Sequence, residues 1–163
     1  QRVALRNAGV PVILSVAGFS RDEFVELAKR TASTGAAAIE LNLSCPNVAH
    51  GTGARCFAQN ADETREVVAS VKKVTPLPVF AKLSPEVADL PVIAKAALDG
   101  GADVLTLINT LAGMVIDVES ERPVLANGTG GMSGPAIRPL GRSCEHTRCT
   151  AAHRPRKHEA NNA

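Results

Sequence analysis

The segment Leu41-Asn42-Leu43-Ser44-Cys45-Pro46-Asn47 combines residue types that can do chemistry. A cysteine thiolate acts as a base or nucleophile near neutral pH, and an asparagine amide can both donate to and accept from a polar ring. The segment closes the apolar run 36–43, which predicts a buried parallel strand. Functional residues of α/β folds gather where such strands end, so Cys45 is a candidate catalytic residue and Asn42 and Asn47 are candidate binding residues. A buried structural cysteine is the alternative interpretation of Cys45 taken alone.

Two further predicted strands end in polar residues. Lys82 lies at the end of the run 77–83, and Asn109 and Thr110 follow the run 103–108. In a parallel barrel these ends share one face, so a thiol, an ammonium and several amides would meet at one cavity. An unpaired charge at a buried strand end is costly, and a phosphate, a carboxylate or a reduced flavin would each serve as its partner. A salt bridge at the rim is the alternative for Lys82.

Strands and helices alternate along the chain, which predicts right-handed crossovers and a parallel sheet. Ser20 and Glu23 form a capping-box pattern before the first helix, and Gly35 follows its end. The fold class expected is α/β, a partial TIM (β/α)8 barrel of about four consecutive βα units. Strands are expected at 11–17, 36–43, 77–83 and 103–108, and helices at 21–34, 62–74 and 86–99.

The segment after the fourth strand has a different pattern. Residues 111–126 suggest a β-hairpin with Glu121-Arg122-Pro123 near its turn. The stretch 127–135 is rich in glycine, which would let backbone N–H groups approach a ligand closely. A flexible surface loop is the alternative interpretation of that stretch.

Composition limits the classes of function. The 163 residues carry a formal net charge of +2, which gives no reason to expect nucleic acid or an anionic membrane as a partner. No apolar run reaches the roughly 20 residues that cross a bilayer. Four cysteines at irregular spacing do not form a disulfide framework, so we expect a reducing, cytoplasmic location.

Residues 141–163 contain no Leu, Ile, Val, Met or aromatic residue. Such a segment cannot offset its ordering entropy, so we expect a disordered, non-native tail after one barrel domain at 1–140. Four residues of the tail are of metal-binding types and could be drawn as a zinc site: Cys144, Cys149, His153 and His158. Their pairs are more widely spaced than usual zinc ligands, and we expect no metal site.

Four motifs in order carry a family resemblance. They are Leu-Asn-Leu-Ser-Cys-Pro-Asn at 41–47, Ala-Lys-Leu-Ser-Pro at 81–85, Ile-Asn-Thr at 108–110 and Thr-Gly-Gly-Met-Ser-Gly-Pro-Ala at 129–136. Over about Pro11 to Pro139 the chain resembles dihydroorotate dehydrogenases of the NAD-linked class 1B. NAD-linked dihydropyrimidine dehydrogenases share part of the pattern and are the nearest alternative.

The resemblance implies an FMN-binding (β/α)8 barrel that oxidises dihydroorotate to orotate in pyrimidine biosynthesis. Cys45 resembles the base that removes the substrate C5 proton while the C6 hydride passes to flavin N5, and Lys82 resembles the lysine beside the flavin. The implied substrate contacts are Asn42, Asn47, Asn109 and Thr110, and the implied cofactor contacts are Ser15, Asn42, Lys82, Ile108 and Gly134. Implied partners are an electron-transfer subunit with FAD and an iron–sulfur cluster, and further copies of the intact protein.

The chain also departs from the family pattern. Ser15 stands where the family usually has asparagine, and the first and last barrel strands are absent, as in a gene fragment. The loss of apolar periodicity after Leu140 suggests a reading-frame shift. An open half-barrel would expose strand edges and self-associate. A catalytically inactive fragment, or an interaction module that retains one barrel face, is therefore the second functional hypothesis.

Overall fold

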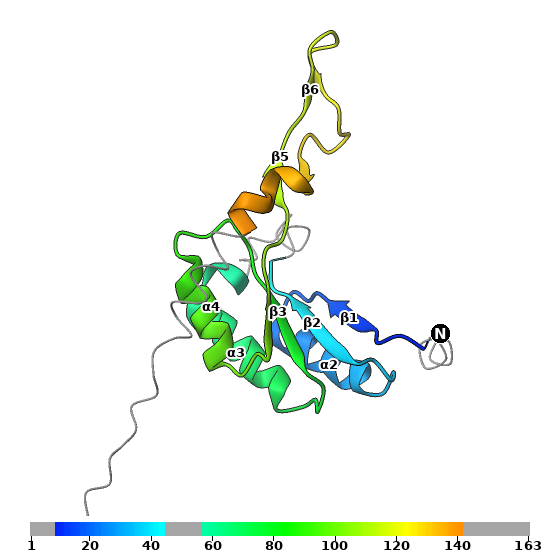
Figure 1. Ribbon diagram of the computed structural model, residues 1–163, viewed down its shortest axis with the longest axis vertical. Helices are drawn as coiled ribbons and strands as arrows, with labels where there is room; N and C mark the ends of the chain where they lie inside the picture. The colour runs from blue at the N-terminus through cyan, green and yellow to red at the C-terminus, as the bar shows by residue number, and fades with distance from the viewer. Residues whose placement is uncertain (1–8, 45–56, 142–163) are drawn as a thin grey trace, which may run out of the picture.

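The computed structural model describes residues 9–44 and 57–141, and its body is a parallel sheet with helices between successive strands (Figure 1). The strands are β1 (Ile13–Val16), β2 (Ala38–Asn42), β3 (Val79–Lys82) and β4 (Val104–Thr106). The helices are α2 (Arg21–Ala32), α3 (Ala61–Lys72) and α4 (Leu90–Asp99). The strands lie in the order β1-β2-β3-β4, so each pairs with the next along the chain. This arrangement confirms the predicted partial barrel of successive βα units.

The two faces of the sheet differ in chemistry. Alternate strand residues such as Ile39, Leu41 and Val79 are fully buried and form one core with apolar residues of the three helices. Burial of each such side chain contributes about 1.5–3 kcal/mol relative to exposure. The intervening residues Glu40, Asn42 and Lys82 are only half-buried and lie on the opposite face. The core therefore holds the sheet from one side and leaves its polar side available.

The first helix begins as its sequence predicts. Ser20 Oγ accepts a hydrogen bond from the Glu23 backbone N–H at 3.2 Å, and the Glu23 carboxylate accepts one from the Phe19 N–H at 2.6 Å. The backbone of Gly35 has φ +87°, a left-handed value that suits glycine after a helix end. The Ser20 N-cap and the glycine stop are thus confirmed, whereas the Glu23 side chain bonds the N–H of Phe19, one residue before the N-cap, and does not complete a capping box.

Helix α4 begins four residues later than the expected 86. Asp89 is its N-cap and accepts from the Val92 N–H at 3.2 Å. Glu86 instead accepts a 2.7 Å hydrogen bond from the Ala112 N–H. The predicted start was wrong because the Glu86 side chain ties the β3–α4 connection to a segment distant in sequence.

The segment 111–132, called the arm below, projects away from the βα body (Figure 1). It contains β5 (Leu111–Gly113), β6 (Ile116–Asp117), β7 (Arg122–Pro123) and β8 (Gly130–Met132), with β5 paired to β8 and β6 to β7. The expected hairpin is confirmed, although Arg122 and Pro123 lie in its returning strand. Part of the glycine-rich stretch is strand β8 and was wrongly expected to be loop throughout. Exposed apolar side chains of the arm include Met114, Val115, Ile116, Val118, Val124 and Leu125.

None of the helices in the described ranges is long and apolar enough to cross a membrane. Residues 142–163 lie outside those ranges and include the two cysteines and two histidines considered as a zinc site. The expectations of a disordered tail and of no zinc site therefore stay predictions.

Asp103 joins the amino-terminal end of the sheet to helix α3. Its Oδ2 accepts from Lys72 Nζ at 2.8 Å and from the Val79 N–H at 2.7 Å. The hydrogen bond from Lys72, then that from Val79, hold the pKa of Asp103 below its usual 3.8. The ionised carboxylate is therefore favoured by folding.

Stability from Asp103 should be present above about pH 4 and lost as pH falls through the lowered folded-state pKa. We expect Asp103→Asn to remove this acid-dependent part, worth up to about 1 kcal/mol after solvent screening. Urea unfolding at pH 6 and pH 3 measures it. Asp99→Asn, which breaks the exposed Lys95–Asp99 pair on α4, is the matched control and should change the pH dependence less. Equal pH dependence in wild type and Asp103→Asn would contradict the assignment.

Candidate active site

The carboxyl ends of β2, β3 and β4 bring three of the predicted site residues together. Asn42 is paired in register with Lys82, and Lys82 with Thr106. Asn109 follows β4, where its N–H donates to the Leu83 carbonyl at 2.9 Å. Paired residues of parallel strands point to the same side of a sheet, so Asn42 and Lys82 share the polar face. The expected meeting of the ammonium group and two of the amides is present in the structure, whereas the thiol of Cys45 lies outside the described residues.

Asn109 is the most buried residue of this group, at 8% exposed. Its Nδ2 donates to the Ser44 carbonyl at 3.0 Å and to Ser44 Oγ at 2.7 Å. The same nitrogen lies 3.2 Å from Asn42 Oδ1, which also accepts from Ser44 Oγ at 3.3 Å. Thr110 N–H donates to Asn109 Oδ1 at 2.9 Å. The amide of Asn109 thus joins the ends of two strands that are not neighbours in the sheet.

Lys82 lies between Asn42 and Thr106 on the polar face and is half-buried. Among the described residues its ammonium group has neither an ion pair nor a hydrogen bond. A partly desolvated cation without a counter-charge favours an anionic ligand. The salt-bridge alternative for Lys82 has no partner in the described ranges.

Glu40 is a site-face residue that sequence reasoning missed. Its Oε1 accepts from Ser15 Oγ at 2.8 Å, and its Oε2 accepts from Thr106 Oγ1 at 2.8 Å. The carboxylate therefore links β1 to β4 across the sheet, and the hydroxyl proton of Ser15 is already donated to it. The signal was available: within the apolar run, Glu40 and Asn42 alternate with Ile39 and Leu41, which indicates one polar face.

Two predicted cofactor contacts, Ile108 and Gly134, lie near the base of the arm. A cavity of about 560 Å³ includes Ile108 and Gly134, the two predicted backbone contacts, in one wall. Its other lining residues are Leu107, Pro135, Ile137, Arg138 and Gly141. Gly134 has φ +94° and ψ −163°, a conformation essentially restricted to glycine. Apart from its two chain neighbours, none of the described residues has a heavy atom within 4 Å of the position a Cβ would take there, so the backbone of Gly134 is open toward them on that side.

Thr110 is held by the arm itself. Gly131 of β8 lies so close that an added Cβ would come within 2.8 Å of Thr110 Cβ. Thr110 is half-buried and follows Asn109 directly. The glycine-rich stretch thus positions a predicted substrate residue by close backbone approach.

Cys45 and Asn47 lie outside the described residues, and Ser44 is the last residue described before them. Their proposed roles therefore rest on sequence alone. Ser44 itself is 6% exposed and held by Asn109, so the described chain is fixed up to the residue before the cysteine.

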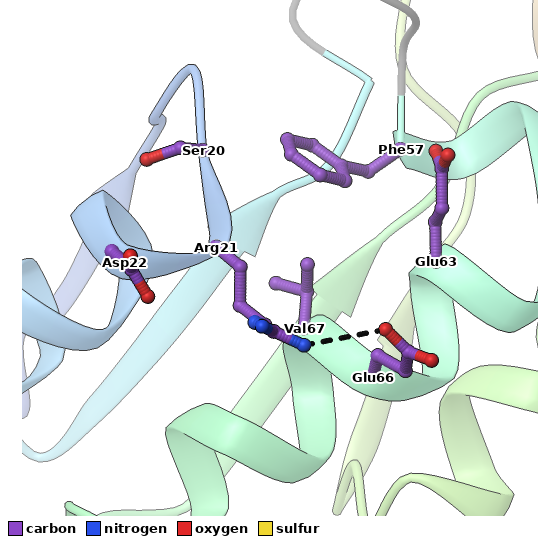
Figure 2. Close-up of a pocket in the computed structure, with 7 residues that line it drawn as sticks. All are labelled: Ser20, Arg21, Asp22, Phe57, Glu63, Glu66 and Val67. Atoms are coloured by element: carbon purple, nitrogen blue, oxygen red, sulfur yellow. Dashed lines mark hydrogen bonds and ion pairs between the residues drawn. The ribbon is translucent and has the colours of Figure 1, made fainter.

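A second cavity, of about 360 Å³, lies in the helical layer between the start of α2 and α3 (Figure 2). Figure 2 shows Arg21 turned toward Glu66, with their charged groups 3.3 Å apart. The other lining residues are Ser20, Asp22, Phe57, Glu63 and Val67. This cavity is on the helical side of the sheet, and none of the predicted site residues lines it.

Comparison with known proteins identifies one family. The family model for dihydroorotate dehydrogenase matches residues 1–147. The catalytic subunit of dihydroorotate dehydrogenase B (NAD(+)) from Geobacter sp. strain M21 is 51% identical over 137 residues, covering 83% of this chain and 44% of that protein. The same subunit from Listeria welshimeri is 50% identical with the same coverage. The chain thus spans less than half the length of these curated relatives.

Solved structures with low identity show the fold alone. The carboxyl transferase domain of Rhizobium etli pyruvate carboxylase, solved with oxamate and biotin, has a TM-score of 0.52 at 11% identity. The match covers 66% of this chain and 18% of that one. At such identity no function transfers, whereas the family match runs through all four motifs and the strand-end cluster described above. The chain belongs to the dihydroorotate dehydrogenase family.

Proposed function

We propose that this chain is part of a flavoenzyme that oxidises dihydroorotate to orotate in pyrimidine biosynthesis. The observation that carries the proposal is the meeting of Asn42, Lys82 and Asn109 at one edge of the sheet in a chain of this family. Amides and an ammonium group suit a pyrimidine ring with a carboxylate and a flavin beside it. The relatives named as catalytic subunits of dihydroorotate dehydrogenase B support the same reaction.

The described residues fit the ring system of a flavin, and we propose FMN as the cofactor. Lys82 offers a cation without a partner among the described residues, and Ile108 and Gly134 offer backbone at a shared cavity. When bound, the flavin would accept the hydride from C6 of the substrate. Lys82 would favour the anionic reduced cofactor by its charge. Ser15 stays a predicted cofactor contact through its hydroxyl oxygen, since its proton is donated to Glu40.

Substrate handling is proposed for the sequence segment that follows β2 and for the residues after β4. Cys45 would take the C5 proton, which is acidified by the adjacent carbonyl group. Asn42, Asn47, Asn109 and Thr110 would hold and orient the pyrimidine. Ser44 and Asn109 support this role because their hydrogen bonds fix the chain that enters the Cys45 segment.

The name "catalytic subunit" of the relatives implies a separate subunit for electron transfer. We propose that the intact protein works with a partner that carries FAD and an iron–sulfur cluster, as a homo-oligomer in the cytoplasm. Neither nucleic acid nor a membrane is part of this proposal.

Reconstitution with FMN tests the proposed function. The purified chain should bind FMN with quenching of flavin fluorescence, and anaerobic dihydroorotate should then bleach the oxidised-flavin absorbance. Dihydrouracil is the control substrate and should bleach the flavin far more slowly, because it lacks the carboxylate. Faster bleaching by dihydrouracil would favour a dihydropyrimidine dehydrogenase. Failure to bind FMN would favour the catalytically inactive fragment or interaction module.

A further inference from the structure

The arm is placed differently from the helices of the βα body. Burial of apolar side chains holds the three helices against the sheet, but no residue of the arm belongs to that core cluster of the described residues. The arm instead projects from the body at β5, which follows directly on Asn109 and Thr110 (Figure 1). Its position relative to the binding face therefore depends on contacts at its base.

One contact at the base of the arm comes from Glu86, in the connection between β3 and α4. Glu86 Oε1 accepts a hydrogen bond from the Ala112 N–H of β5 at 2.7 Å. A hydrogen bond to a charged acceptor is roughly twice as strong as one between neutral groups. The carboxylate thus attaches the arm to a part of the body that is 26 residues away in sequence.

The backbone that carries Glu86 is itself held by the end of β3. The Glu86 N–H donates to Ser84 Oγ at 3.0 Å, and Ser84 is buried. Leu83, the preceding residue, is fully buried and bonded to the end of the next strand. Its N–H donates to the Thr106 carbonyl at 3.1 Å, and its carbonyl accepts from the Asn109 N–H at 2.9 Å. Glu86 is therefore fastened to the strand ends that form the binding face.

The base of the arm also contacts Thr110. Ala112, which Glu86 holds, is paired in register with Gly131 of β8. There is no room for a side chain between Gly131 and Thr110, since a Cβ on Gly131 would lie 2.8 Å from Thr110 Cβ. Thr110 is half-buried, and its N–H donates to Asn109 Oδ1 at 2.9 Å. A movement of β5 and β8 away from the body would therefore release the Thr110 side chain on one side.

We propose that Glu86 is a positioning residue, which fastens the base of the arm to the end of β3 and thereby holds Thr110 in place at the binding face. Glu86 acts through Ala112 and Gly131, and the role requires an acceptor atom at the end of a side chain of this length. Glutamine has the same length and an amide oxygen that accepts, whereas alanine offers no acceptor. The contact of Thr110 with the substrate rests on the proposed function, whereas the fastening of the arm does not.

Backbone amide exchange tests the fastening without a ligand. In the isotope-labelled full chain, Glu86→Ala should speed exchange of the Ala112 N–H with water by roughly tenfold, because the acceptor is lost. The nuclear Overhauser signal between Gly131 and the Thr110 methyl group should weaken in the same variant. Glu86→Gln should retain most of both signals.

Glu119→Ala is the matched control for Glu86→Ala. It removes an exposed acid from the arm away from β5 and should leave both signals unchanged. Equal exchange of the Ala112 N–H in Glu86→Ala and the wild-type chain would overturn the proposal. Exchange in the wild-type chain as fast as in an unstructured peptide would overturn it too, even if Glu86→Ala fails to fold.

Orotate binding tests whether Glu86 acts through Thr110. We expect Glu86→Ala to weaken orotate binding to the FMN-reconstituted chain by roughly three- to tenfold with FMN affinity unchanged, and Glu86→Gln to recover most of the loss. In a Thr110→Ala background, adding Glu86→Ala should weaken binding no further. Calorimetry gives the dissociation constants. Equal losses in Glu86→Gln and Glu86→Ala, or a further loss in the double variant, would overturn the positioning role. If the wild-type chain binds no orotate, the proposed function fails, and the exchange experiment still decides the fastening.

Discussion

Replacing Cys45 with serine is expected to slow dihydroorotate oxidation by roughly 10²- to 10⁴-fold, the contribution usual for a general base. Serine keeps the size of the side chain, but its hydroxyl group ionises far above neutral pH. Proton removal from C5 should therefore fail while the site stays otherwise intact. The measurement is the anaerobic rate of flavin bleaching by dihydroorotate, in the FMN-reconstituted chain or in a version completed with the missing barrel segments.

Cys56→Ser is the matched control for Cys45→Ser. Cys56 lies eleven residues further along the sequence, outside the Ser-Cys-Pro motif, so its replacement should leave the rate nearly unchanged. FMN affinity should be the same in both variants, because the proposal gives the Cys45 thiol to the substrate. Full activity of Cys45→Ser together with loss of activity in Cys56→Ser would show that the base is misassigned and the motif misaligned.

Replacing Leu41 with alanine is expected to lower the free energy of unfolding by about 2–5 kcal/mol. Leu41 is fully buried on the helical side of β2 and pairs in register with Val16 and Ala81 on the flanking strands. Truncation would leave a cavity at the centre of the sheet that close-packed neighbours fill only partly. Urea unfolding followed by far-ultraviolet circular dichroism measures the change.

Val118→Ala is the corresponding control in the arm. Val118 is 86% exposed, so its truncation should change the free energy of unfolding by no more than about 0.5 kcal/mol. If Leu41→Ala unfolded at the same urea concentration as the wild-type chain, the core would not be centred on β2.

The order of the elements could be predicted because each one is specified locally. Apolar runs, the Ser20 N-cap and the glycine after α2 all act within a few residues of the chain. The start of α4 could not be predicted in this way. Glu86 is a good helix former, but its carboxylate is used by the Ala112 N–H, 26 residues away in sequence. Strand β8 was missed for a similar reason, since Gly130 and Gly131 form a strand only through their pairing with β5.

The sequence could predict which residues lie at the site but not the hydrogen bonds between them. Motif order along parallel strands is sufficient to place Asn42, Lys82 and Asn109 at one edge. The sequence does not specify which end of an amide faces the protein, because that depends on Ser44 and Thr110 contacts between strand ends. Glu40 could not be recognised from the sequence as a residue that links strands, because its two hydroxyl donors come from Ser15 and Thr106, which are distant from it in sequence.

We expect the arm and the βα body to differ in how freely they accept substitutions. No residue of the arm belongs to the core cluster of the described residues, so substitutions there can accumulate at little cost to the sheet. Gly131 is the exception, because any side chain at that position would press on Thr110, the neighbour of the buried Asn109. Substitutions in the rest of the arm are therefore expected to leave the stability of the body nearly unchanged. A substitution at Gly131 would instead displace Thr110 at the binding face.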